Sequence, residues 1–255
     1  IEDNVLKLTK NVGSMLGGFI IDDLDAGATI YGFTADFKLL IGGGNQADGF
    51  SFSFGPDVPD AGISEEGAGS GLSVCFDTYD NGGGEAPAID IKKGGVIIAS
   101  FKQGAAALMR KNAFVDVHLE VKNDGSLTLS VAGTVVYNNL VGAFVPTAGR
   151  FGLGARTGGA TDNHFVDDLN LTTITAAPTH PVVTSASPQG ADARPDAVVT
   201  VTIQDKAGAT VNASAVKVKF DGADVAANVS KTGDTTTVTH DPPGVLASLS
   251  AHTVN

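Results

Sequence analysis

The stretch that decides the fold reads ADGFSFSF at residues 47–54 and, after a glycine-rich loop, LSVCFDTYDN at residues 72–81. Both segments alternate apolar and polar residues with period two, which predicts two half-buried strands. A carboxylate precedes the first strand, and an Asp/Asn pair follows the second. Because a β-sandwich carries its loops at strand ends, these oxygen groups are expected to gather at one end, where they could hold a hard cation and a polyol together.

Composition limits the classes of partner. The chain has 255 residues, with 28 acidic and 16 basic side chains and a net charge of −12. This balance would repel a phosphate backbone, so we expect no nucleic-acid partner. No apolar run approaches the roughly 18 residues that a spanning helix needs, so we expect no membrane insertion.

Turn residues and strand patterns dominate the first two thirds of the chain. The sequence contains 33 glycines and little helical periodicity, which favours an all-β protein. Residues 115–137 alternate as a three-strand meander, and residues 104–111 are the one segment with a plausible helical turn. The number and spacing of strands over residues 1–173 predict a jelly-roll sandwich of two sheets.

Composition changes after a Thr/Ala/Pro-rich segment. Residues 174–181 are predicted to be a linker, and residues 182–255 to form a smaller, immunoglobulin-like β-sandwich of short Val- and Thr-rich strands. Two of these strands are expected at residues 225–229 and 235–239. The chain begins at Ile1 and ends within a strand-like segment at Asn255, so we expect a processed product whose parent protein continues further.

The single cysteine, Cys75, excludes an internal disulfide. Free cysteines favour protein interiors, and this one lies within a predicted strand. We therefore interpret Cys75 as a small buried residue.

Three motifs in residues 1–173 resemble the L-type, concanavalin A-like lectin family. ADGFSF at residues 47–52 is similar to the family's Ala-Asp-Gly entry into an aromatic strand, and VCFDTYDN at residues 74–81 is similar to its metal-binding strand. GARTGG at residues 154–159, followed by Asn163-His164, is similar to the late loop that borders the sugar site. Residues 182–255 resemble the bacterial immunoglobulin-like modules of large secreted and surface proteins.

The resemblance implies a carbohydrate site. Asp48 would accept hydrogen bonds from two sugar hydroxyls, the backbone N–H of Gly69 would donate one, and Asn81 would contact the sugar. Tyr79 is the candidate for an aromatic platform, and Thr157 and Gly158 would belong to the late loop. The family's Ala-Asp peptide is cis, so a cis peptide is expected between Ala47 and Asp48.

The same resemblance implies calcium as a cofactor. The ion would be held by Asp77, the carbonyl of Tyr79, Asn81 and Glu85, which supply the oxygen ligands that calcium prefers. Where the family has a glutamate and a histidine for a transition metal, this chain has Cys75 and Ala86-Pro87-Ala88. No manganese site is therefore expected.

These observations favour a non-catalytic carbohydrate-binding module of a larger secreted or surface bacterial protein. Its partner would be a glycan or polysaccharide. A homo-oligomer and contacts with tandem modules of the same protein are further possible assemblies. One alternative is a structural or adhesive spacer, or a fibre subunit, with a decayed sugar site. A weaker alternative is a glycoside hydrolase, but the paired carboxylates that such an enzyme needs on one strand are not identifiable.

Overall fold

The computed structural model describes residues 1–189, 193–247 and 250–255. The chain divides into two compact units, Ile1–Ala176 and Ala177–Asn255. The division falls within the segment that the sequence suggests as a linker, although the last strand of the first unit reaches Ile174.

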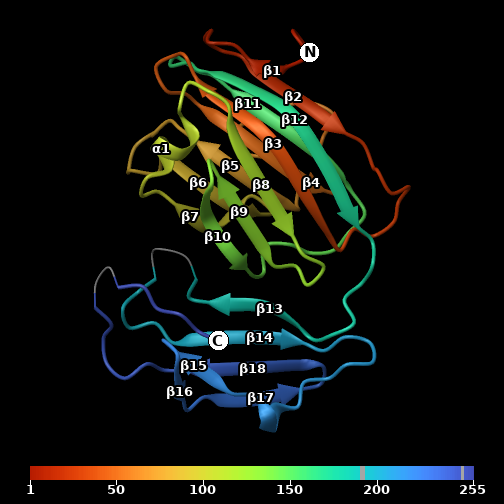
Figure 1. Cartoon of the computed structure of the whole chain (residues 1–255), viewed down its shortest axis with the longest axis vertical. Helices are drawn as coiled ribbons and strands as arrows, with labels where there is room; N and C mark the ends of the chain where they lie inside the picture. The colour runs from red at the N-terminus through yellow and green to blue at the C-terminus, as the bar shows by residue number, and fades with distance from the viewer. Residues whose placement is uncertain (190–192, 248–249) are drawn as a thin grey trace. The chain divides into compact units, whose positions relative to one another are not determined.

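The first unit consists of two antiparallel sheets that lie face to face (Figure 1). One sheet has the strand order β1-β12-β3-β8-β9-β10. Its strands are β1 (Leu6–Thr9), β12 (Asn163–Ile174), β3 (Gly32–Gly42), β8 (Val115–Val121), β9 (Leu127–Val131) and β10 (Thr134–Leu140). The predicted meander is thus confirmed as β8, β9 and β10.

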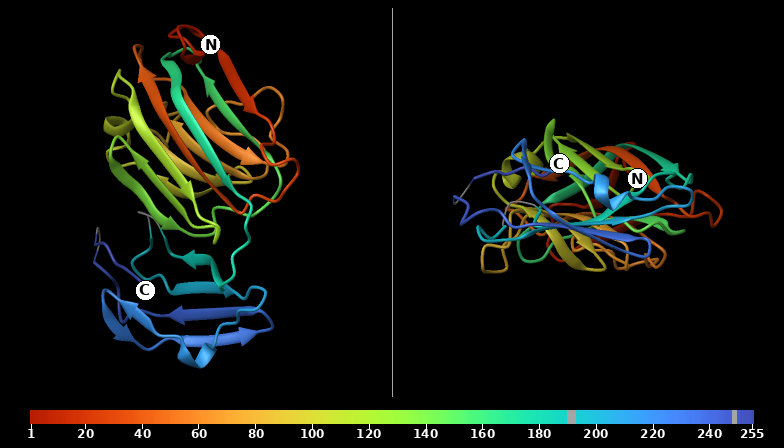
Figure 2. Two further views of the ribbon diagram at one scale, coloured as in Figure 1. Left: turned by 45° about the vertical axis from the view of Figure 1, so that its right-hand side comes forward. Right: turned by 90° about the horizontal axis from the view of Figure 1, so that it is seen from below.

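The second sheet has the order β2-β11-β4-β5-β6-β7. Its strands are β2 (Leu16–Ile21), β11 (Arg150–Arg156), β4 (Gly49–Gly55), β5 (Leu72–Asp77), β6 (Ala88–Lys93) and β7 (Val96–Phe101). The predicted helical turn is the short helix α1 (Ala105–Met109). Figure 2 shows the two layers from other directions.

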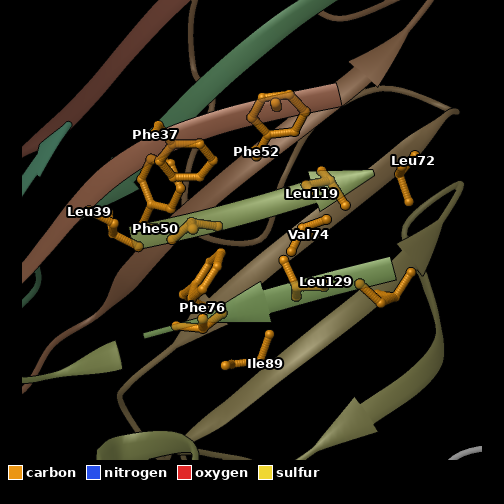
Figure 3. Close-up of a cluster of buried hydrophobic side chains, with 14 of the residues drawn as sticks. Phe37, Leu39, Phe50, Phe52, Leu72, Val74, Phe76, Ile89, Leu119 and Leu129 are labelled. Carbon is orange, nitrogen blue, oxygen red and sulfur yellow. The ribbon is translucent and has the colours of Figure 1, made fainter. Parts of the chain in front are cut away.

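Aromatic side chains fill the space between the sheets. The apolar faces of β4 and β5 point toward those of β3, β8 and β9, as Figure 3 shows. Phe33 of β3 is fully buried, with its ring centroid 5.1–5.9 Å from the rings of four other phenylalanines. These four are Phe52, Phe54, Phe144 and Phe151. The alternation in residues 50–54 and 72–76 therefore reports the core correctly.

The opposite face of β4 is also buried, because the loop between β4 and β5 folds over it. Ser51 donates to the carbonyl of Ser64 at 2.6 Å, and the amide of Ala68 donates to Ser53 at 3.1 Å. Ile63 of this loop packs where a side chain at Gly154 would overlap it. The absence of a side chain at Gly154 thus allows residues 56–71 to cover the sheet. This loop places Glu65 near Gly49, at the start of β4.

Cys75 lies on this covered face and is a free, buried thiol, as predicted. Burial raises its pKa to about 12. The thiol is therefore protonated at neutral pH and is a poor nucleophile or metal ligand.

The second unit contains a sheet of order β13-β14-β18-β17 and a short β15-β16 ladder. Its elements are β13 (Val182–Ser187), β14 (Val199–Gln204), η1 (Ala213–Ala215), β15 (Val218–Phe220), β16 (Ala223–Val225), β17 (Asn228–Thr232) and β18 (Thr235–His240). The prediction of one strand at residues 225–229 is wrong, because β16 ends at Val225 and β17 begins at Asn228. The immunoglobulin-like assignment stays a prediction. Within the described ranges, no helix is long and apolar enough to cross a membrane.

A buried histidine gives the first unit a specific pH dependence. His164 of β12 is fully buried with Nδ1 2.7 Å from the hydroxyl of Thr9, and burial lowers its pKa to about 4. Below pH 6.5 the unfolded chain binds a proton that the folded chain excludes, so the free energy of unfolding should fall by about 3 kcal/mol between pH 7 and pH 4 from this group alone.

Chemical denaturation of His164→Gln at both pH values tests this expectation. The variant should lose that part of the pH dependence, whereas His118→Gln, at an exposed histidine paired with Asp36, should retain it. An unchanged pH dependence in His164→Gln would contradict the assignment.

Candidate functional site

Asp48 immediately precedes β4, and its backbone is hydrogen-bonded to Arg156, at the end of β11, and to Thr78, which follows β5. Its amide donates to the carbonyl of Arg156 at 2.9 Å. Its own carbonyl accepts from the amide and the hydroxyl of Thr78, at 2.9 and 3.0 Å. The Ala47–Asp48 peptide is cis, as the resemblance implies. The backbone of Asp48 is consequently fixed between the end of β11 and the loop that follows β5, and its side chain is 12% exposed.

Gly158 lies directly over this carboxylate. A Cβ atom at Gly158 would be 3.4 Å from both carboxylate oxygens of Asp48. The late loop therefore approaches Asp48 through a residue without a side chain. The structure thus brings these two predicted site residues together.

The hydroxyl of Thr157, another predicted site residue, makes hydrogen bonds within the protein. It donates to the carbonyl of Val12 at 2.6 Å and accepts from the amide of Met15 at 2.9 Å. The residue is buried, so both hydrogen-bonding functions of its hydroxyl are used within the protein. Thr157 attaches the late loop to the N-terminal segment, and its contact with a sugar stays a prediction.

Gly69 is also separated from Asp48, in contrast to its predicted role. It lies against Asp57, since a Cβ atom at Gly69 would be 2.9 Å from Oδ1 of that residue. The β4–β5 ladder begins with Gly49 opposite Asp77 and ends with Phe54 opposite Leu72, near Gly69. At about 3.3 Å per residue, this ladder separates Gly69 from Asp48 by more than about 15 Å.

The loop after β5 begins beside Asp48, because Asp77 pairs with Gly49. Oδ1 of Asp77 accepts from the amide of Tyr79 at 3.1 Å, and Glu85 accepts from the amide of Asn81 at 2.8 Å. The predicted residues thus share one short loop, in which the Tyr79 side chain is exposed.

The donor set of this loop fits calcium. Burial raises the pKa of Asp77 to about 7, and a carboxylate in such surroundings is stabilised by a cation beside it. Asp77, Glu85, Asn81 and the carbonyl of Tyr79 offer only oxygen ligands, which calcium prefers. In the described part of the chain no cluster of three or more His, Cys, Asp or Glu side chains could hold a metal ion. A calcium ion here would therefore depend on carbonyl, amide and water oxygens as well as carboxylates.

Cys75, which stands where the lectin family has a glutamate for a transition metal, lies on the covered face beside Asp77. Cys75 pairs across the ladder with Asp90, a buried residue whose pKa is raised by burial. The protonated thiol of Cys75 is unsuited to a hard cation. The absence of a manganese site stays a prediction.

Arg156 and Glu65 belong to the site but were not predicted from the sequence. Nε of Arg156 lies 3.1 Å from Oδ2 of Asp48, and the same guanidinium donates to both oxygens of Glu65 at 2.5–3.0 Å. Glu65 is buried and raises the pKa of Arg156. The sequence showed Glu65 only as one of two carboxylates in a glycine-rich loop, so its contact with β11 depends on how that loop folds.

A hydrogen-bonded series of Ser250, His252 and Asp221 occurs in the second unit. His252 lies 2.7 Å from the hydroxyl of Ser250 through Nε2 and 2.7 Å from Asp221 through Nδ1. Asp221 also accepts from the amide of Thr253 at 2.8 Å, and the histidine ring stacks on Phe220. These contacts attach the segment after residue 250 to β15, so we assign them a structural role.

Comparison with solved structures supports the fold of the first unit. The VIP36 exoplasmic/lumenal domain in its Ca2+/Man-bound form has a TM-score of 0.56 and 19% sequence identity, covering 70% of this chain and 82% of that one. The carbohydrate recognition domain of Emp47p has a TM-score of 0.50 and 19% identity, covering 68% and 84%. The metal-free lectin I-B4 from Griffonia simplicifolia has a TM-score of 0.50 and 16% identity, covering 67% and 88%.

The first unit therefore has the concanavalin A-like β-sandwich fold of L-type lectins. At these identities the likeness establishes the fold and not the ligand. No protein-family model and no curated protein sequence matches this chain.

Proposed function

We propose that residues 1–176 form a non-catalytic carbohydrate-binding module that binds a glycan at Asp48. The observation that carries this proposal is the Asp48 carboxylate, 12% exposed, which lies against Gly158 and beside the Asp77–Glu85 loop. A carboxylate accepts hydrogen bonds only, and sugar hydroxyls are effective donors to it. The structural neighbours named above include a mannose-bound form and a carbohydrate recognition domain, which supports the same ligand class.

Calcium is part of this proposal. Asp77, Asn81, Glu85 and the carbonyl of Tyr79 would hold the ion. When bound, it would fix the loop after β5, so that Asn81 and Tyr79 stay beside Asp48. The calcium-bound form of VIP36 supports calcium as the metal for this fold. We further propose that the chain acts outside the cytoplasm as part of a larger secreted or surface protein, for which the lumenal or exoplasmic origin of VIP36 offers support.

A glycan array tests the proposed function. Labelled protein is applied to neutral and acidic saccharides, once with calcium and once with a chelator. We expect binding to one saccharide class with calcium and weaker binding with chelator. Failure to bind any glycan under both conditions would favour the alternative of a structural or adhesive module.

Calcium binding is expected to stabilise the first unit. At 100 times the dissociation constant, calcium should add about 2.7 kcal/mol to the free energy of unfolding, which a thermal melting curve resolves. Asp77→Asn should abolish most of this gain because it removes a charged ligand. Asp80→Asn is a matched control in the same loop, since Asp80 accepts from the amides of Gly82 and Gly84 and is not a proposed ligand. Equal calcium shifts in both variants would exclude the proposed metal site.

A further inference from the structure

Arg156 is only partly used by its contacts within the protein. Glu65, whose side chain is 3% exposed, holds one edge of the guanidinium, and Asp48 lies at Nε. The Arg156 side chain nevertheless remains 47% exposed. A guanidinium has five N–H donors and no acceptor, and the contacts with Glu65 use only Nε and Nη2, so the donors of Nη1 remain for a ligand.

A second arginine, Arg150, lies at the other end of β11 and can be compared with Arg156. Arg150 begins β11, donates to the carbonyl of Val58 at 2.7 Å, and pairs with the exposed carboxylates of Asp22 and Asp60. It is thus a surface ion pair distant from Asp48. Arg156, in contrast, is held by a buried carboxylate beside the proposed ligand-binding carboxylate, which fixes where its free donors lie.

We propose that Arg156 contacts the saccharide directly as the donor beside the acceptor Asp48, and that this pair, with Glu65, selects neutral over acidic saccharides. The inference rests on the proposed carbohydrate-binding function. Arg156 contacts the ligand, Glu65 positions Arg156, and the ligand is an uncharged saccharide.

A donor next to Asp48 is required by the chemistry of a sugar hydroxyl. Each hydroxyl donates one hydrogen bond and accepts others, so a carboxylate satisfies only its donating half. The backbone donor expected from Gly69 lies at the other end of the β4–β5 ladder. Nε of Arg156 lies 3.1 Å from Asp48 and donates its one N–H to Glu65. The Nη1 group, which takes no part in these contacts, is the donor available to the oxygen of a hydroxyl that Asp48 accepts from.

The charge of this group indicates which saccharides fit. Two carboxylates, Asp48 and Glu65, share one guanidinium, so the group is net negative. The neighbouring loop adds the carboxylates of Asp77, Asp80 and Glu85, whose three negative charges exceed the two positive charges of a bound calcium ion. A uronic or sialic acid would therefore meet like charge, whereas a neutral sugar would not, and such repulsion is a common source of specificity.

The test is isothermal titration of the intact protein with neutral saccharides and with the matching uronic acids. The neutral saccharides are the methyl glycosides of glucose, galactose and mannose and oligosaccharides of the same sugars. Arg156→Gln alone would leave the buried Glu65 unpaired, so the double variant Glu65→Gln/Arg156→Gln is used, which replaces the ion pair by two neutral amides. Arg150→Gln is the matched control, and a melting curve establishes that each variant is folded.

We expect wild-type protein to bind a neutral glycoside at least about tenfold more tightly than its uronic acid. The double variant should lose about tenfold or more in affinity, because a hydrogen bond from a charged donor is lost, while Arg150→Gln stays within about twofold. Arg156→Lys should recover only part of the loss, because an ammonium group lacks the planar fork.

The possible failures are distinguishable. If wild-type binding is lost in Asp48→Asn but unchanged in the folded double variant, the role of Arg156 is overturned and the carbohydrate site stands. Equal or tighter binding of uronic acids overturns the selectivity. If wild-type protein binds none of the saccharides, the proposed function and this inference both fail.

Discussion

Replacing Asp48 by alanine is expected to lower glycan affinity by about two orders of magnitude or more. The carboxylate is proposed to accept two sugar hydroxyls, and each hydrogen bond to a charged group contributes about 1.5–3 kcal/mol. The backbone of Asp48 makes its contacts with Arg156 and Thr78 through main-chain atoms, which the substitution keeps. Isothermal titration with the strongest glycan from the array measures the loss.

Asp116→Ala is the control for this result. Asp116 is exposed on β8 in the other sheet, where it pairs with Lys38, so its removal should leave affinity unchanged. Asp48→Asn provides a second test at the site, since it keeps the shape and removes the charge. Unaltered affinity in both Asp48 variants would place the binding site elsewhere.

Replacing Phe33 by alanine is expected to cause the largest loss of stability. Its buried ring contacts four other aromatic rings, and truncation of a buried phenylalanine costs about 3–5 kcal/mol. For a unit of this size the melting temperature should fall by about 10 °C or more. Thermal unfolding followed by circular dichroism measures the change.

Phe114→Ala is the matched control for the core. Phe114 is 37% exposed beside the start of β8, so its truncation should change the free energy of unfolding far less. Phe33→Leu keeps most of the volume and should be intermediate in cost. A loss at Phe114 as large as that at Phe33 would mean that the core described here does not carry the stability of the first unit.

The strands and the core were predictable because period-two alternation can be recognised within each single strand. The phenylalanines of β4 alternate with serines, and the pattern alone identifies which face is apolar. The pattern did not reveal that Ser51 and Ser53 are also buried. That burial depends on a loop of residues 56–71 that covers the strand, which no local periodicity reports.

The site was predictable in part for a related reason. Asp48 and the Asp77–Glu85 loop follow from motifs within one strand or turn, and strand pairing then brings them together. Gly69 was misplaced because the path of a long loop is set by tertiary contacts, here by Asp57 and Val58. Arg156 and Glu65 lie 91 residues apart in the sequence, and only the fold shows that they form a pair.

The most direct test is a crystal structure of the protein with calcium and the neutral saccharide that binds best. We expect sugar hydroxyls within about 2.6–3.2 Å of the Asp48 carboxylate and of the Arg156 guanidinium, beneath Gly158. We also expect calcium held by Asp77 and Asn81. A saccharide bound at another surface, with Asp48 facing solvent alone, would contradict the central claim.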